Sequence, residues 1–399
     1  MIDSRFPPLL KKVEVPLYPL KNYSRLRYST NESLESYLAN YYSVSEEQIY
    51  LADRASSLLY FFLKWYSKKF PEMKVAIPAF CCFEVCQAVL QAGCIPVFLD
   101  IEESCVISEK SLYFASENQC RILIFPHYFG FRSHLASRVE LAKKLGLFFI
   151  NDEAQSFPEV EQRFRPKCDL TLFSFGTSKR LGCPWGGGFC FSNEKLSKEF
   201  WNDFNFSGES YGVGSYLKHF IKRKAQLFKP YYQNKIGLNP NLEKDMEVLL
   251  EKKKCVFPCK NLSQFQKNFI LHFIKQYAKS KNVLMERLEK VKMGVIEAFG
   301  NAALDYLQDV SLPSTLAIRI PETISRRSFF SYFSDNFIQT TWYYFPLNQL
   351  SFLKKFPAEE LKNTEKVARS IGILPFQWKH SQGEVTALLF ALKGFRENY

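Results

Sequence analysis

The chain has 399 residues, of which 47% are hydrophobic, and a formal net charge of +13 at pH 7. This length and the even spread of apolar residues exclude a disordered or fibrous protein and favour two domains in one polypeptide. The positive charge favours anionic partners such as phosphorylated metabolites, an acidic membrane surface or nucleic acid, without choosing among them.

The first residues, MIDSRFPPLL, contain an aspartate and prolines, whereas a signal peptide has a basic end followed by an apolar stretch. No long charge-free apolar run follows them, so we expect a cytoplasmic location without a membrane span. The 11 cysteines include no CxxC pair, which favours free thiols in a reducing compartment. The 5 histidines show no metal-ligand spacing, and we expect no metal.

Short apolar strands alternate with amphipathic helices through the first half of the chain. In chain order, the pattern predicts a helix over 33–43, a strand at 48–52, a helix over 56–68, a strand at 74–78, a helix over 83–92, strands at 95–99 and 121–126, a helix over 134–145, and strands at 147–150, 170–175 and 188–192. This alternation is typical of an α/β domain with a mainly parallel sheet between helices. In such sheets, ligands bind beyond the carboxyl ends of the strands.

The second half of the chain begins with a helical, basic and irregular stretch at 201–255, which we interpret as an insertion. Its densest basic and aromatic part, 216–235, is either a helix with a solvated basic face or a contact for a diphosphate or membrane. The later elements are a long helix over 261–299, strands at 316–320, 340–344 and 371–375, and a helix after 381. We therefore predict a large domain over 1–255, and a linking helix with a smaller α/β domain over 256–399.

Two polar motifs follow neighbouring buried strands. NDEAQ at 151–155 follows the strand LFFI, and FSF at 173–175 precedes a loop that contains Lys179. Taken singly, an aspartate after a strand is usually a turn former and a lysine in a loop usually faces solvent. Together, Asp152 and Lys179 could hold an electron-poor pyridine ring over an amine.

The order of these motifs resembles the DegT-type sugar aminotransferases, in which Glu-Asp-Ala-Ala-Gln is followed by Phe-Ser-Phe, a lysine and a Gly-Gly pair. Here the pieces are NDEAQ, FSF with Lys179, and GGG at 186–188, and they are preceded by PAF at 78–80, AGCIPVFLD at 92–100 and PHYFG at 126–130. The resemblance implies the α/β fold of fold type I transferases, with a mainly parallel sheet of the seven-stranded type and a smaller C-terminal domain. It also implies pyridoxal 5′-phosphate as the cofactor, and a homodimer.

The resemblance assigns roles to three residues around the cofactor ring. Lys179 would form the internal aldimine and then move protons. Asp152 would keep the pyridine nitrogen protonated, because an adjacent carboxylate favours the charged form. Gln155 would hydrogen-bond the 3-hydroxyl oxygen.

The phosphate group would bind at the start of the helix after Arg54, where free backbone N–H groups favour an anion. Ala55 and Ser56 lie at that turn, and Ser174 would donate to the phosphate. The family commonly has Ser-Gly-Thr-Ala where this chain has DRAS at 53–56. The threonine hydroxyl is therefore missing, and Arg54 could supply charge instead.

Two further family positions are altered. The aromatic residue that stacks on the cofactor ring falls at Cys82 or Phe83, of which only Phe83 can stack. The family's Asn-x-Arg-Met-Ser segment, whose asparagine reaches the partner subunit's phosphate, appears as CKNLS at 259–263. The expectation of contacts across the subunit interface is weaker for this reason.

The resemblance implies an aminotransferase that moves an amino group, from glutamate, to the keto group of a nucleotide-linked sugar. The segment 216–235 could meet the diphosphate, and Arg319, Arg326 or Arg327 could meet a carboxylate. A lyase or dehydratase that uses the same cofactor stays open, because the cofactor is the electron sink in each case. A non-catalytic protein whose basic surface binds a membrane or nucleic acid is a further open alternative. If the protein is an aminotransferase, we expect no nucleic-acid partner.

Overall fold

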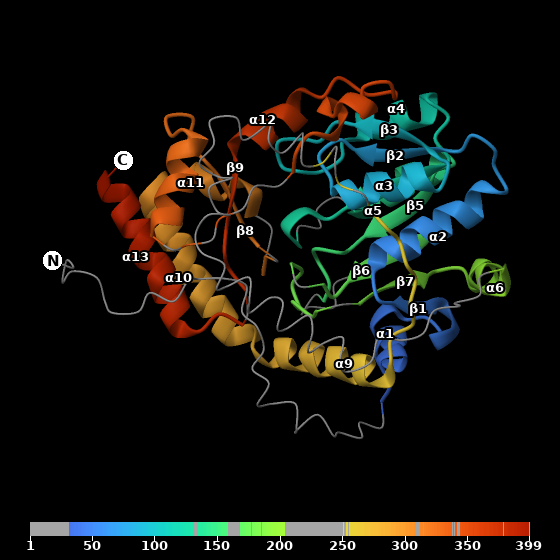
Figure 1. Ribbon diagram of the computed structural model, residues 1–399, viewed down its shortest axis with the longest axis horizontal. Coiled ribbons are helices and arrows are strands. Elements are labelled where there is room, and N and C mark those ends of the chain that lie inside the picture. The colour runs from blue at the N-terminus through green and yellow to red at the C-terminus, as the bar shows by residue number, and fades with distance from the viewer. Residues whose placement is uncertain are drawn as a thin grey trace.

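A seven-stranded sheet forms the body of the protein in the computed structural model (Figure 1), in the order β1-β7-β6-β5-β4-β2-β3. The strands are β1 (Ile49–Ala52), β2 (Lys74–Pro78), β3 (Ile95–Leu99), β4 (Ile122–Pro126), β5 (Phe148–Asp152), β6 (Leu170–Ser174) and β7 (Gly187–Phe191). β7 pairs antiparallel with β1 and β6, and the other pairs are parallel. The expected mainly parallel α/β sheet is confirmed.

The structure describes residues 32–130, 135–158, 168–176, 178–184, 186–203, 250, 253, 255–307, 312–313, 315–336, 338, 340, 344–377 and 379–398. The basic segment 216–235 and most of the expected strand at 340–344 lie outside these residues. None of the helices within them is long and apolar enough to cross a membrane.

Helices cover both faces of the large sheet (Figure 1). One face packs against α2 (Ala55–Ser67), α3 (Phe83–Gln91) and α6 (Glu194–Asp203), and the other against α1 (Leu34–Tyr42), α4 (Glu109–Glu117) and α5 (Leu135–Lys144). Along β4, Ile122 and Ile124 join the first cluster, whereas Leu123 and Phe125 join the second. Burial on both faces explains why this strand is a continuous apolar run rather than an alternating one.

Two helix predictions needed correction. No element was predicted between 100 and 120, but α4 lies there and begins after Ser108, whose side chain accepts a hydrogen bond from the Ser111 N–H at 3.0 Å. The single helix predicted over 261–299 is two helices, α9 (Gln264–Lys279) and α10 (Lys281–Phe299). They meet at Ser280, whose hydroxyl donates to the Gln276 carbonyl at 2.9 Å and so competes with the regular helical bonding.

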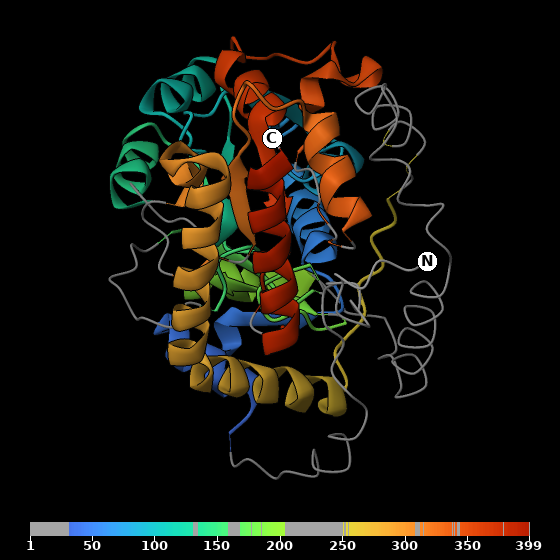
Figure 2. The same cartoon turned by 90° about the vertical axis from the view of Figure 1, so that its left-hand side faces the viewer.

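A second, antiparallel sheet of β8 (Leu316–Arg319) and β9 (Ile371–Leu374) follows these helices. Around it lie α11 (Arg326–Asp335), α12 (Lys362–Ser370) and α13 (Gln382–Asn398), and Figure 2 shows α10 and α13 side by side. Short 3₁₀ turns occupy Glu46–Gln48, Tyr128–Gly130, Asn301–Leu307, Leu347–Gln349 and Ser351–Leu353.

Asp100, the last residue of AGCIPVFLD, connects the large sheet to α12. Its Oδ1 accepts from the Thr364 N–H at 2.7 Å, and its Oδ2 accepts from the Asn363 N–H at 3.1 Å. α12 has no side-chain cap from its own N-cap residue, Leu361. Asp100 therefore caps a helix more than 250 residues later in the chain, which gives this motif residue a structural role.

Candidate active site

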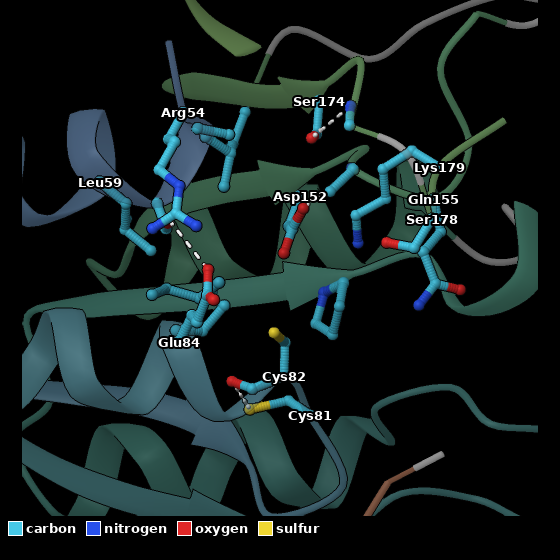
Figure 3. A pocket seen from close by; sticks show the side chains of 18 of the residues that line it. Arg54, Leu59, Cys81, Cys82, Glu84, Asp152, Gln155, Ser174, Ser178 and Lys179 are labelled. Carbon is cyan, nitrogen blue, oxygen red and sulfur yellow. Dashed lines mark hydrogen bonds between the residues drawn. The ribbon is translucent and has the colours of Figure 1, made fainter. Parts of the chain in front are cut away.

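A cavity of about 410 Å³ lies at the edge of the large sheet where its parallel strands end. The residues that follow β1, β2, β4, β5 and β6 line it, and Tyr344, from the C-terminal part of the chain, completes the described wall. Figure 3 shows the cavity from close by. This is the position at which the predicted topology places a ligand.

Asp152 and Lys179 enter this cavity from neighbouring strands. Asp152 ends β5 and is paired with Leu172 of β6. Lys179 lies in the loop after β6, where its N–H donates to the Gly176 carbonyl at 2.9 Å. Figure 3 shows both side chains directed into the same space. Among the described residues, no acceptor binds the Lys179 amine, so this amine is available to a ligand.

Burial raises the pKa of the Asp152 carboxyl, and a hydrogen bond from the Ala154 N–H at 2.9 Å and the nearby Lys179 partly offset this effect. The side chain is buried, with 7% of the residue exposed. A carboxylate held in a low-dielectric site gains most from a cationic partner. Asp152 is thus suited to hold a protonated ring nitrogen.

Gln155 lies on the cavity wall and is fixed at both ends of its amide. Its Oε1 accepts from the Phe129 N–H at 2.7 Å, and its Nε2 donates to the Tyr344 hydroxyl. The Tyr344 ring also meets the ring of Phe80 edge-on, with centroids 5.4 Å apart. Sequence reasoning did not find Tyr344, because nothing in the local pattern places position 344 beside position 155.

His127 is a second residue that sequence reasoning did not single out, although PHYFG was noted. It lines the cavity, and its Nε2 hydrogen-bonds the Asn151 Oδ1. The Asn151 amide nitrogen in turn donates to the buried Glu153 carboxylate at 3.0 Å. The family motif begins with glutamate and has alanine two positions later, whereas this chain has Asn151 and Glu153. Alternate residues of an extended chain share a face. A carboxylate at position 153 therefore lies on the same side of the chain as the family's carboxylate at position 151, which is the side that faces His127.

The phosphate end of the predicted site is the start of α2. Arg54 is the N-cap residue, and α2 has no side-chain cap. Ser174 lines the same cavity, and its hydroxyl accepts from the Gly176 N–H at 3.3 Å. The start of α2 lies against Gly187 of β7, where an added Cβ would be 2.6 Å from the Ala55 nitrogen. Only glycine permits this approach, which explains the glycine at the start of β7.

We expect Gly187→Ala to displace the start of α2 and to cost about 1–3 kcal/mol of unfolding free energy, because the new methyl group overlaps backbone. Thermal unfolding of the apo-protein measures the loss, and cofactor affinity should fall with it. Gly383→Ala is the matched control, because the nearest atom to its added Cβ is the Ser381 hydroxyl at 4.0 Å. Equal melting temperatures for the two variants would contradict this account.

Phe83 does not stack over the cavity. Cys82 is among the residues that line it and Phe83 is not, because Phe83 begins α3 with its ring near Phe352, at a centroid distance of 6.5 Å. The Lys253 amine lies over the same ring, 5.7 Å from its centroid. Burial raises the pKa of the Cys82 thiol, so a neutral thiol occupies the position expected for the aromatic ring.

Two other predicted groups are not among the described residues that line the cavity. CKNLS at 259–263 runs beside the phosphate end, where the Asp53 N–H donates to the Lys260 carbonyl at 2.9 Å, but Asn261 is exposed. Arg319 lies 3.4 Å from Asp305 in an ion pair, and neither it, Arg326 nor Arg327 is among the described residues that line the cavity. No cluster of His, Cys, Asp or Glu side chains in the described part of the chain could hold a metal ion.

The cavity residues fit pyridoxal 5′-phosphate. The Lys179 amine suits the aldehyde carbon, Asp152 suits the ring nitrogen, and the uncapped start of α2 suits the phosphate. The gap that Gly187 leaves beside the Ala55 nitrogen lets this helix start lie at the cavity. A volume of about 410 Å³ lies in the range of small-molecule sites.

Comparison with known proteins shows a family whose model matches nearly the whole chain. Residues 20–393 match the model of the DegT/DnrJ/EryC1/StrS aminotransferase family. A UDP-N-acetyl-3-dehydro-α-D-glucosamine 3-aminotransferase from Acidithiobacillus ferrooxidans is 30% identical over 121 residues, which is 30% of this chain and 33% of that protein. The chain spans about a third of the length of the curated relatives it matches.

Solved structures share the fold over nearly the whole chain. Helicobacter pylori PseC, an aminotransferase involved in the biosynthesis of pseudoaminic acid, has a TM-score of 0.65 at 15% identity and covers 98% of both chains. DesV from S. venezuelae, in complex with a ketimine intermediate, has a TM-score of 0.63 at 16% identity and covers 94% of both chains. At these identities the likeness establishes the fold.

Proposed function

This chain belongs to the DegT/DnrJ/EryC1/StrS aminotransferase family, and from that premise we propose that it transfers an amino group from glutamate to the keto group of a nucleotide-linked sugar. Its cofactor is pyridoxal 5′-phosphate, which supplies the electron sink for the carbon that loses or gains the amine. The observation that carries the proposal is the Lys179 amine beside the buried Asp152 carboxylate in one cavity.

Lys179 would hold the cofactor covalently and, once an incoming amine displaces it, would move a proton to and from the reacting carbon of the substrate. It lies in the loop after β6, rather than inside the strand, and lines the cavity. Asp152 would keep the ring nitrogen protonated, because a positive charge on that nitrogen lowers the cost of burying the Asp152 carboxylate.

The remaining polar groups would orient the cofactor. Gln155, fixed by Phe129 and Tyr344, would present its amide to the 3-hydroxyl oxygen. The phosphate would lie between the Ser174 hydroxyl and the N–H groups of Ala55 and Ser56 at the start of α2.

The acceptor and the assembly are inferred from relatives. The name of the Acidithiobacillus protein specifies a nucleotide sugar, and the Helicobacter enzyme is involved in the biosynthesis of pseudoaminic acid. A keto sugar linked to a nucleoside diphosphate is anionic, which suits a chain with a net charge of +13. We include a homodimer in the proposal, as the resemblance implies.

Two half-reactions test the proposal. With the protein loaded with pyridoxal 5′-phosphate, glutamate should convert the cofactor to its pyridoxamine form and release one equivalent of 2-oxoglutarate. A UDP-linked 3-keto sugar should then restore the first spectrum and yield an amino sugar. Glutamate that leaves the spectrum unchanged would exclude this donor, and a keto sugar that loses water instead of gaining nitrogen would favour the dehydratase alternative.

A further inference from the structure

We propose that Arg54 binds the phosphate group of the cofactor and takes the place of the hydroxyl donor that the family commonly has at this turn. The inference rests on the proposed function, because it concerns the same cavity. Arg54 lines this cavity at the start of α2 together with Ala55 and Ser56.

The start of α2 leaves its first-turn N–H groups without a side-chain acceptor. Arg54 occupies the N-cap position with extended backbone, φ −148° and ψ 136°, where serine, threonine, asparagine or aspartate would supply an oxygen. An arginine has only donors, so it cannot cap the helix. The N–H groups and the guanidinium belong to residues that line the same cavity, and all of them favour an anion.

The Arg54 guanidinium is uncommitted within the described part of the chain. Its residue is exposed, and it forms no hydrogen bond or ion pair with a described residue. The neighbouring Asp53 carboxylate instead accepts from the Lys260 N–H at 3.1 Å. In Figure 3 the Arg54 side chain extends along the cavity toward Glu84.

Ser56, the one hydroxyl of this turn that lines the cavity, is already engaged. Its Oγ donates to the Glu84 Oε2 at 3.2 Å, and a hydroxyl has a single hydrogen to donate. The Lys253 amine lies 3.5 Å from the other oxygen of the same carboxylate. Glu84 would therefore occupy the Ser56 donor and also repel a phosphate. A guanidinium at position 54 that donates two hydrogen bonds to the phosphate replaces the lost Ser56 donor, and its positive charge offsets the repulsion from Glu84.

The test compares two ligands that differ only in the phosphate. Dissociation constants for pyridoxal 5′-phosphate and pyridoxal are measured for the wild type, Arg54→Gln and Arg54→Lys. Arg54→Gln should weaken binding of the phosphorylated ligand by about 10- to 100-fold, the size expected when a hydrogen bond to a charged group is lost. Binding of pyridoxal should change by less than about twofold, and Arg54→Lys should fall between the two, because a lysine keeps the charge without the fork.

Arg396→Gln on α13 is the control, because it removes the same charge from an exposed position far along the chain. Equal losses for both ligands, or no loss for either, would overturn the inference. It would also fail if Arg54→Gln raised the KM for the nucleotide sugar alone, since the guanidinium would then meet the diphosphate of the substrate. Repeating the titration in a Lys179→Ala background tests Arg54 without the covalent link, so that failure of the proposed chemistry stays distinguishable.

Discussion

Lys179→Ala is expected to abolish the visible absorption band of the loaded protein and to lower amino transfer by about 10⁴-fold or more, because one side chain acts as both anchor and acid–base group. The amine projects into the cavity without a hydrogen-bond acceptor among the described residues, so its removal breaks no hydrogen bond there and costs only its attraction to the Asp152 carboxylate. We therefore expect thermal unfolding of the apo-protein to change little. Spectra and melting curves recorded on the same sample separate loss of chemistry from loss of fold.

Lys179→Arg sharpens this result. The guanidinium keeps a positive charge near Asp152 but stays protonated, so it has no free amine for the covalent link. The variant should lose the band as completely as Lys179→Ala does. Lys393→Ala, on the exposed face of α13, should keep it. A band that survives in Lys179→Arg would assign the covalent link to another lysine and contradict the site described above.

Asp152→Asn is expected to have opposite effects on activity and on stability. Amino transfer should fall by about 10²- to 10³-fold, the usual cost of removing one electrostatic group that stabilises developing charge. The apo-protein, in contrast, should melt at a higher temperature at pH 7. The reason is that burial raises the pKa of this carboxyl, so the ionised form is held at a cost in the folded state.

The pH dependence of this stability effect follows from the sign of the shift. Because the folded-state pKa lies above the unfolded value of about 3.9, the folded protein binds more protons between the two values, and stability falls as pH rises through that window. The gain in stability of the apo-protein from Asp152→Asn should therefore be absent below this pH window and complete above it. Melting temperatures of both apo-proteins across the acid range measure it.

Asp169→Asn provides the comparison. Burial raises the pKa of Asp169 as well, but this residue lies before β6 and accepts from the Phe149 N–H at 2.7 Å outside the cavity. The Asp169→Asn substitution should therefore leave amino transfer near the wild-type rate. An apo Asp152→Asn protein that is less stable than the wild type at neutral pH would show that the Lys179 and Ala154 contacts outweigh the burial of this carboxylate.

The strands of the large sheet and most of the helices that cover it follow from the sequence, because local patterns indicate which of their residues are buried. Each of the seven strands is a short apolar run bounded by turn residues, and each was predicted to within about two residues. Helix α4 was missed, although Ser108 caps it in the ordinary way. The break at Ser280 was missed because the apolar periodicity continues across it.

The sequence by itself determined, through ordered motifs, that two side chains meet at the cavity: Asp152 after β5 and Lys179 after β6, because parallel strands end at the same edge. Only the tertiary structure decided which other side chains join them. Tyr344 reaches Gln155 across 189 positions of sequence, and Asp100 caps α12 rather than entering the site. It also placed Cys82, not Phe83, at the cavity, because the direction of a side chain at a helix start depends on the packing of the whole helix. Local patterns fix which residues lie at the ends of strands, whereas contacts between distant segments depend on packing that no local pattern records.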